Sequence, residues 1–186
     1  MRTFIAIEID EVVRRRIAEL QMTLKKQFPR LRWSNPATIH LTLKFLGEVD
    51  AAGADAVQAE LARIAASTVP FTIAFRQCGI FPPSGPPRVV WVGVDDAAGA
   101  LARCRDAIEA GIAPLGFPTE DRPYRPHLTL ARCPDARAAR DLRAAIDVHR
   151  QIDAGEMIVR HLVYFQSTLT QKGPVYNPIS TYELRG

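Results

Sequence analysis

The chain has 186 residues, enough for one domain or for two small lobes with a real core. Hydrophobic residues (47%) and charged residues (24%) occur at the levels usual for a soluble globular protein. The formal net charge is +4, and most of the basic residues are arginines. Arginine suits bidentate phosphate contacts, so a polyanionic substrate is one interpretation. An equally good interpretation is that the abundance of arginine reflects the base composition of the source genome.

Cysteine spacing and apolar runs exclude several classes of protein. Cys78, Cys104 and Cys133 are scattered and form no C-x-x-C pair, which argues against a disulfide framework and a zinc site. No apolar stretch approaches the roughly 18 residues of a membrane helix. The first ten residues are interrupted by Glu8 and Asp10, unlike a signal peptide. We therefore expect a cytoplasmic monomer with reduced thiols and no membrane partner.

The first half of the chain predicts strands and helices in alternation. Residues 3–9 alternate as a strand, and Asp10 is placed to cap a helix that Pro29 ends. A short strand at 31–33 and a turn at Asn35-Pro36 lead to a strand at 38–45, closed by Gly47. Asp50 is placed to cap a second helix, followed by a strand at 71–80. The expected buried stripes are Val13, Ile17, Leu20, Leu24 and Phe28, then Val57, Leu61 and Ile64.

The second half continues the pattern after a proline-rich loop at 81–87. A strand at 88–94 precedes a helix capped by Asp95 or Asp96, and an extended segment at 118–126 enters a strand at 125–131. A helix opens at Pro134-Asp135, and strands follow at 157–167 and 175–184 with a turn at 172–174. The buried residues expected on the two helices are Leu101, Cys104, Ile108 and Ile112, then Leu142, Ile146 and His149.

Two strands often stand between helices and are joined by short turns, which favours antiparallel pairing. The fold class is therefore α+β rather than a doubly wound parallel sheet. The simplest arrangement is a single domain over residues 1–186, in which two similar lobes with outer helices share one central groove.

A repeated tetrapeptide is the most informative feature of the sequence. His-Leu-Thr-Leu occurs at residues 40–43 and again at 127–130, about half the chain apart. On a strand, alternate side chains share a face. His40 and Thr42 therefore share one face, as do His127 and Thr129, while the leucines point to the other.

These residue types fit metal-free phosphoryl chemistry. A histidine with a pKa near 6.5 holds or releases a proton at neutral pH, so two of them can act as base and acid. Threonine hydroxyls donate hydrogen bonds to phosphate oxygens as charge develops. The motif has no carboxylate for a metal and no Ser or Cys nucleophile.

One histidine in an apolar strand is more often structural than catalytic. Two identical copies in equivalent contexts are hard to explain by core packing alone, so we favour a functional role for His40 and His127. His149 falls near the end of a predicted helix stripe, and His161 lies in a predicted strand with no threonine two residues later, so we interpret both as structural or exposed.

At these residues the chain resembles the 2H phosphoesterase superfamily, which is defined by paired H-x-T-x motifs. Within it, the chain is most similar to the RNA 2′,3′-cyclic phosphodiesterase family, also called 2′-5′ RNA ligases. The matching stretches are residues 4–7, 40–47, 79–82, 88–94 and 122–132, with a looser match at 167–176.

The resemblance implies a bilobal fold and hydrolysis of 2′,3′-cyclic phosphate RNA ends to 2′-phosphomonoesters, without metal or cofactor. It implies that His40 protonates the leaving 3′-oxygen, that His127 activates water, and that Thr42 and Thr129 hold the phosphate. The reverse reaction would join RNA ends by a 2′-5′ linkage. Expected partners are RNA ends, such as tRNA halves, or nucleotides.

Further residues are candidates for substrate binding. On simple alternation Lys44 shares a face with His40, and Arg125 shares one with His127, so either could meet phosphate. Arg132 falls on the opposite face but follows the second motif in the family pattern. Tyr124, Phe81 and Tyr176 are candidates for stacking on a base, although such aromatics more often serve packing.

Three alternatives stay open. The chain could be a non-catalytic binder of RNA ends, or a cyclic phosphodiesterase that acts on small nucleotides or an ADP-ribose cyclic phosphate. It could also be a metal-dependent hydrolase with His40 and His127 as ligands. The last is disfavoured, because no third ligand stands at suitable spacing.

Overall fold

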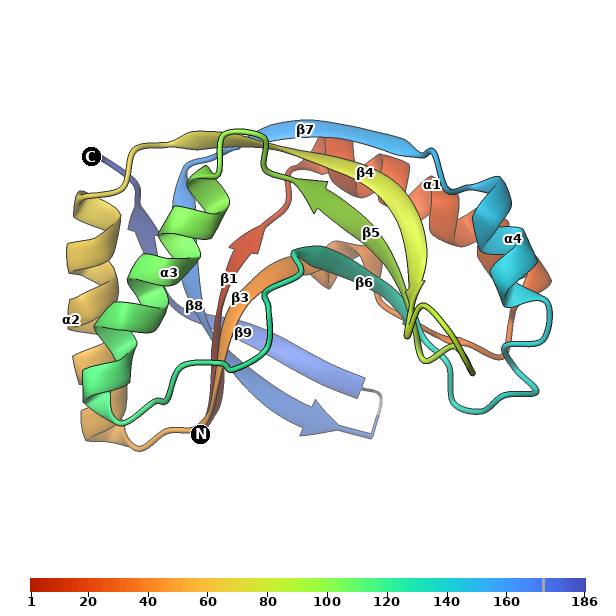
Figure 1. The fold of residues 1–186 in the computed structure, drawn as a ribbon. Helices are drawn as coiled ribbons and strands as arrows, with labels where there is room; N and C mark the ends of the chain where they lie inside the picture. The colour runs from red at the N-terminus through yellow and green to blue at the C-terminus, as the bar shows by residue number, and fades with distance from the viewer. Residues whose placement is uncertain (172) are drawn as a thin grey trace.

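The computed structural model of the protein describes residues 1–171 and 173–186. It contains two sheets with helices packed on them (Figure 1). In chain order the elements are β1 (Arg2–Glu8), α1 (Glu11–Gln27), β2 (Arg32–Trp33), η1 (Pro36–Thr38), β3 (His40–Glu48), α2 (Ala51–Ala66), β4 (Phe71–Phe81), β5 (Val89–Asp95), α3 (Ala100–Ile112), η2 (Ala113–Leu115), β6 (His127–Arg132), α4 (Leu142–Val148), β7 (Asp153–Val159), β8 (His161–Thr170) and β9 (Gly173–Glu183). The expected turn at 172–174 begins at a residue outside the described ones.

Both sheets are antiparallel, which confirms the α+β class. The first has the strand order β3-β1-β8-β9, and the second has the order β2-β6-β5-β4-β7. Apart from the two-residue β2, each sheet is four-stranded with a His-Thr strand at one end. Strands β3 and β6 therefore lie side by side where the two sheets meet (Figure 1).

The helices that cover each sheet do not all come from the same half of the chain. Helix α1 comes early in the chain but packs against β7 of the second sheet, and α4 packs against β4 of the same sheet. Helices α2 and α3 pack together against the first sheet. Each lobe is thus assembled from both halves of the chain.

The chain changes sheets at Arg160, where the sequence predicts one unbroken strand. Strand β7 pairs with β4 in the second sheet, whereas β8 pairs with β1 in the first. The switch carries no glycine or proline, and Val159 and Leu162 on either side are fully buried. The exposed pair Arg160-His161 breaks the alternation at the boundary, but apolar, strand-like residues on both sides of it make the two strands look like one in the sequence.

Caps account for where most helices begin. Asp10 accepts a hydrogen bond from the Val13 amide at 2.8 Å. Asp50 does the same for the Gly53 amide at 2.7 Å. The N-cap position of α3 is Gly99, which has no side-chain acceptor. Asp96 supplies one instead, because its Oδ2 accepts a hydrogen bond from the Ala102 amide at 2.9 Å.

Helix α4 is shorter than expected. The sequence predicts a helix from Pro134-Asp135, but α4 begins only at Leu142. Asp141, the preceding residue, has φ of +60°, a left-handed conformation that cannot continue a helix. His149 forms the C-cap of α4 rather than part of its buried stripe.

One apolar core joins both sheets and the helices. It includes Leu41 and Leu43 from the first motif and Leu128 and Leu130 from the second. The expected stripes of α1, α2 and α3 all enter it. Among the described residues, no helix has the length and apolar character needed to cross a membrane.

We predict that Asp10→Ala lowers the free energy of unfolding by about 1 kcal/mol, because the α1 N-terminus loses its capping acceptor. Urea unfolding followed by circular dichroism measures the change. Asp10→Asn is the matched control, since it keeps the acceptor oxygen and should retain most of the stability. Equal stability of all three proteins would show that the cap contributes nothing.

Candidate active site

The first motif contains a β-bulge that decides which side chains surround His40. In the β1–β3 pairing, Ala6 lies opposite Thr42 while Ile5 lies opposite Lys44, so Leu43 is the extra residue. After this bulge the alternation of faces is reversed. Phe45 therefore lies opposite Phe4 on the His40 face, and Lys44 turns toward the core.

The second motif has a bulge at the same position. Trp91 lies opposite Thr129 while Val90 lies opposite Ala131, so Leu130 is the extra residue of β6. Ala131 is fully buried on the core side. Arg132 consequently emerges on the face of His127 and Thr129, where simple alternation does not place it.

Both histidine faces look away from the common core. The leucines of the two motifs are buried in that core, so the imidazoles and hydroxyls point to its opposite side. The phenol of Tyr176, which lies on the His40 side, is influenced by the charge of Arg132 on the His127 face. Burial raises the pKa of the Tyr176 phenol, and the guanidinium groups of Arg132 and Arg2 oppose this shift. Arg132 of β6 thus lies near Tyr176, which contacts His40.

His40 is held in an aromatic pocket of the first sheet. Its ring stacks on Phe4 at 4.8 Å between centroids and meets the edge of Tyr176 at 5.0 Å. Its Nδ1 lies 2.9 Å from the Thr38 carbonyl oxygen. Burial lowers the pKa of His40, while the Thr38 hydrogen bond and the Glu8 carboxylate raise it by less.

His127 has an equivalent arrangement in the second sheet. Its Nδ1 lies 2.7 Å from the Arg125 carbonyl oxygen, and its ring meets Phe81 edge-on at 5.2 Å. A carbonyl oxygen only accepts, so Nδ1 donates in both histidines. In the neutral rings Nε2 then carries the lone pair, and no described residue forms a hydrogen bond with it. Each Nε2 is therefore available to a substrate.

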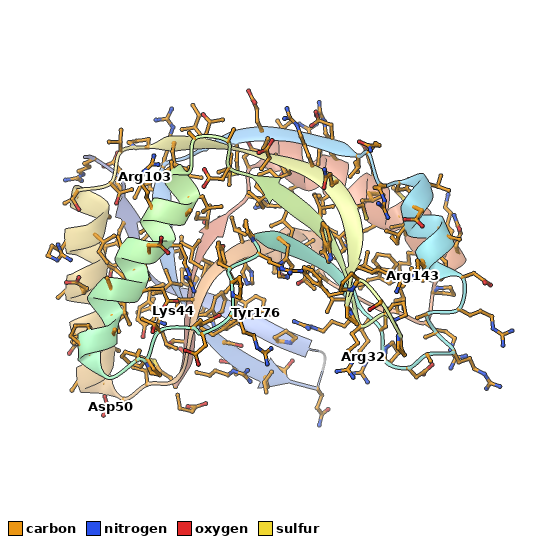
Figure 2. The ribbon with its side chains drawn as sticks, in the orientation of Figure 1. Arg32, Lys44, Asp50, Arg103, Arg143 and Tyr176 are labelled. Carbon is orange, nitrogen blue, oxygen red and sulfur yellow. The ribbon has the colours of Figure 1, made fainter. Side chains whose placement is uncertain are left out.

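The structure separates the substrate-binding candidates into two groups. Arg125 and Arg132 are exposed. Lys44 is 1% exposed, and its Nζ lies 2.7 Å from Glu109 Oε2, so the expected contact with phosphate does not fit its position. The bulge at Leu43 is the physical reason. Figure 2 shows Lys44 and Tyr176 on opposite sides of β3.

The aromatic candidates also have defined positions. Phe81 contacts His127, and Tyr176 contacts His40. Tyr124 instead donates its hydroxyl hydrogen to the Thr42 carbonyl oxygen at 2.9 Å. It is therefore a structural neighbour of the first motif.

Sequence reasoning missed several residues around the two histidines, among them Phe4, Glu8, Phe45, Trp91 and Phe165. Phe4 and Glu8 could be found from the alternation of β1 once its pairing with β3 is known. Phe45 could not, because only the bulge brings it to the His40 face. It is 60% exposed, with its ring 5.9 Å from that of Phe4.

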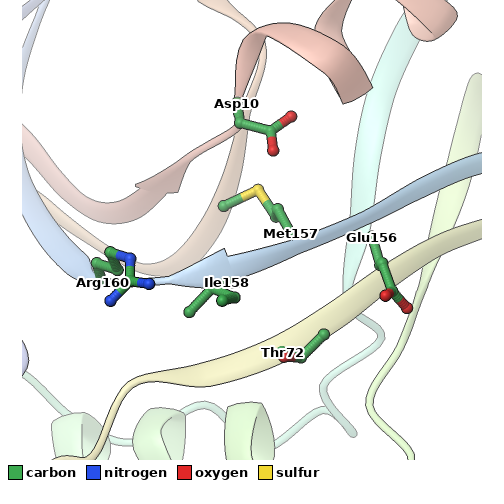
Figure 3. A pocket seen from close by; sticks show the side chains of 6 residues that line it. All are labelled: Asp10, Thr72, Glu156, Met157, Ile158 and Arg160. Atoms are coloured by element: carbon green, nitrogen blue, oxygen red, sulfur yellow. The ribbon is translucent and has the colours of Figure 1, made fainter.

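Two surface cavities lie outside the histidine motifs. One of about 460 Å³ is lined by Asp10, Thr72, Glu156, Met157, Ile158 and Arg160, beside the strand switch (Figure 3). A second of about 210 Å³ lies between the end of β4 and α4. Within residues 1–171 and 173–186, no three side chains of His, Cys, Asp and Glu gather closely enough to hold a metal ion.

We predict that His40 titrates below its usual pKa of about 6.5, which NMR of the imidazole signals can measure. Phe4→Ala should raise the pKa of His40 because it opens the pocket to water. Glu8→Gln should lower it further, because the favourable carboxylate charge is lost. A titration unaffected by both changes would contradict this account.

The same shift has a consequence for stability. The folded state holds the His40 proton less tightly than the unfolded state, so this contribution to stability is present above about pH 6.5. It is lost as the pH falls from there toward the lowered pKa.

Comparisons with known proteins agree with this geometry. Residues 9–168 match the model of the 2′-5′ RNA ligase superfamily. The RNA 2′,3′-cyclic phosphodiesterase of Methanocaldococcus jannaschii is 33% identical over 98% of this chain and 100% of its own length. That of Aeropyrum pernix is 35% identical over 91% of this chain and 94% of its own.

Solved structures show the same architecture. The protein TT0787 of Thermus thermophilus aligns with a TM-score of 0.84 and 30% identity, over 100% of this chain and 99% of its own. Escherichia coli LigT complexed with 3′-AMP aligns with a TM-score of 0.79 and 25% identity, over 100% and 98% of the two chains. The chain therefore belongs to the 2′-5′ RNA ligase superfamily.

Proposed function

We propose that this chain is an RNA 2′,3′-cyclic phosphodiesterase that hydrolyses cyclic phosphate ends to 2′-phosphomonoesters with His40 and His127 as acid and base. The observation that carries the proposal is the matched geometry of the two motifs. In each, Nδ1 is held by a backbone carbonyl, Nε2 is available, and a threonine lies two residues along on the same face. Relatives named RNA 2′,3′-cyclic phosphodiesterase support the activity.

In the proposed reaction, water attacks phosphorus in line with the 3′-oxygen. His127 Nε2 takes a proton from the water, the P–O3′ bond breaks, and protonated His40 donates its Nε2 proton to the 3′-oxygen. The product keeps the phosphate on the 2′-oxygen. Thr42 and Thr129 donate hydrogen bonds to the non-bridging oxygens, where charge builds up. The assignment of acid and base rests on the family resemblance.

The lowered pKa of His40 bears on its role as the acid. Burial leaves this imidazole mostly neutral at pH 7 in the free protein. An anionic phosphodiester next to Nε2 favours the imidazolium, so substrate binding should bring a proton with it. An acid with a lowered pKa also gives up its proton to the leaving oxygen more readily.

The substrate is proposed to lie across the two faces in one shared groove, so that residues 1–186 act as a single domain. Arg125 and Arg132 are exposed near His127 and supply positive charge for phosphates. Phe45 and Tyr176 offer ring surface beside His40 on which a base can stack.

RNA ends, including tRNA halves, and nucleotides are the proposed substrates, and the protein is proposed to act as a monomer in the cytoplasm. The complex of Escherichia coli LigT with 3′-AMP supports nucleotide binding in this fold. In the reverse reaction, the same side chains would join a 2′,3′-cyclic phosphate to a 5′-hydroxyl and form a 2′-5′ linkage. Water competes with that hydroxyl wherever it can enter.

We predict that the protein hydrolyses a 2′,3′-cyclic nucleotide or a cyclic-phosphate RNA in EDTA, with the 2′-phosphate as product. His40→Ala and His127→Ala should each lower kcat by about 10²–10⁴-fold, because each removes one proton-transfer group. Chromatographic separation of 2′- and 3′-phosphates measures both rate and product.

His149→Ala and His161→Ala are the matched controls and should retain full activity, because neither residue belongs to a His-Thr strand face. Binding of RNA ends without turnover would instead favour a non-catalytic binder. Loss of turnover in EDTA, restored by a divalent metal, would favour the metal-dependent hydrolase. Turnover of nucleotides but not RNA would make small cyclic phosphates the substrate.

We also predict that Arg132→Met raises KM about tenfold or more for a cyclic-phosphate RNA, because a charge on the His127 face is lost. Steady-state kinetics at two salt concentrations measures the effect, which should shrink as salt screens the charge. Arg137→Met changes a nearby exposed arginine outside β6 and should leave KM unchanged. Equal KM values for both variants would remove Arg132 from the site.

A further inference from the structure

The polar contacts behind the first motif form a network that reaches the second. Lys44 is turned to the core side of β3 by the bulge at Leu43. Its Nζ donates to Glu109 Oε2 of α3 at 2.7 Å and to the Pro118 carbonyl oxygen at 2.9 Å. The same Glu109 oxygen accepts from the Glu120 amide at 3.3 Å. One buried ion pair thus fixes the start of segment 118–126.

Tyr124 fixes the end of that segment. Its hydroxyl donates to the carbonyl oxygen of Thr42 at 2.9 Å. Its ring lies under the Arg105 guanidinium, 5.2 Å from the centroid, and Arg105 Nη2 is 2.9 Å from Glu109 Oε1. Burial raises the pKa of the Tyr124 phenol, so it stays a hydrogen-bond donor. Both anchors therefore belong to one network built on Glu109.

Segment 118–126 is the link between the two sheets. It follows α3 and η2, of which α3 packs on the first sheet, and it enters β6 of the second sheet. The residue after Tyr124 is Arg125, whose carbonyl oxygen accepts from His127 Nδ1. A short chain of contacts therefore runs from the Thr42 carbonyl through Tyr124 and Arg125 to the imidazole of His127.

We propose that Lys44, Glu109 and Tyr124 are positioning residues that hold the His127 strand against the His40 strand, so that acid and base act on the same phosphate. The inference rests on the proposed function. A buried ion pair adds little net stability over apolar packing, but it defines geometry. Two groups that must act in one transition state are sensitive to small shifts, since roughly 1 Å of misplacement can cost about 10²-fold in rate.

The test compares Tyr124→Phe with Tyr164→Phe. Tyr164 also has a buried hydroxyl, which contacts Thr3 Oγ1 at 3.1 Å, but this contact joins adjacent strands of one sheet. We expect Tyr124→Phe to lower kcat about tenfold or more while KM changes less than about threefold. Tyr164→Phe should leave kcat unchanged even where it lowers the melting temperature. Equal kcat for Tyr124→Phe and the wild type would overturn the proposal.

Lys44→Met and the double variant Lys44→Met/Glu109→Gln separate positioning from stability. The single variant leaves Glu109 without the ammonium, so both its melting temperature and kcat should fall. The double variant removes both charges, and its melting temperature should recover while kcat stays low. If the melting temperature and kcat both recovered in the double variant, Lys44 and Glu109 would have no positioning role. If the pair variants do not fold, Tyr124→Phe decides the question alone.

A readout without turnover keeps this test separate from the proposed function. Chymotrypsin cuts after either Tyr or Phe at position 124, and mass spectrometry identifies the cut. Both Tyr124→Phe and Lys44→Met remove an anchor of segment 118–126. Chymotrypsin should therefore cut at position 124 at least about fivefold faster in these variants than in the wild type or in Tyr164→Phe. Unchanged cutting would overturn the anchoring. A wild type that shows this protection but hydrolyses no cyclic phosphate would refute the proposed function alone.

Discussion

Burial of four leucines is the constraint from which the site follows. Leu41, Leu43, Leu128 and Leu130 must all reach one core, and this forces the imidazoles and hydroxyls of both motifs to its other side. Because β3 and β6 lie where the two sheets meet, the outward faces become neighbours. The same apolar packing that stabilises the fold thus selects which polar groups meet, and no separate scaffold for the histidines is needed.

Sequence periodicity was sufficient for most of the elements and for the faces of the two motifs, since these depend on local pattern, but it missed the late start of α4 and the division between β7 and β8. The stripes of α1 and α2 and the faces of residues 40–42 and 127–129 agree with the structure. Local pattern fails where a residue's environment is set by distant pairing. The bulges at Leu43 and Leu130 reverse the alternation, so Lys44 is buried and Arg132 is exposed beside His127. The strand switch at Arg160 is also set by distant pairing, because β7 pairs with β4 while β8 pairs with β1.

The two lobes are alike in arrangement but differ around their histidines. His40 is enclosed by Phe4, Phe165 and Tyr176, whereas the ring contact of His127 is with Phe81. Identical tetrapeptides cannot supply this asymmetry, and it gives a physical reason for the lowered pKa of His40, whose imidazole is buried among aromatic rings. After each bulge the residue types also differ, with an aromatic ring at position 45 and a cation at 132. The first face is therefore the more aromatic of the two, and the second is the more positively charged.

The order of strands in the first sheet has a consequence for how the protein is made. Strand β1 lies between β3 and β8, so its outer neighbour on one side is contributed by residues 161–170, near the end of the chain. During synthesis the strand that carries His40 can pair with β1 early, but Phe165 and Tyr176, which enclose that histidine, emerge only with β8 and β9. A ribosome-bound chain thus holds both His-Thr motifs long before it can hold an ordered site. The aromatic surroundings of His40 can therefore form only after residues 161–183 have been synthesised.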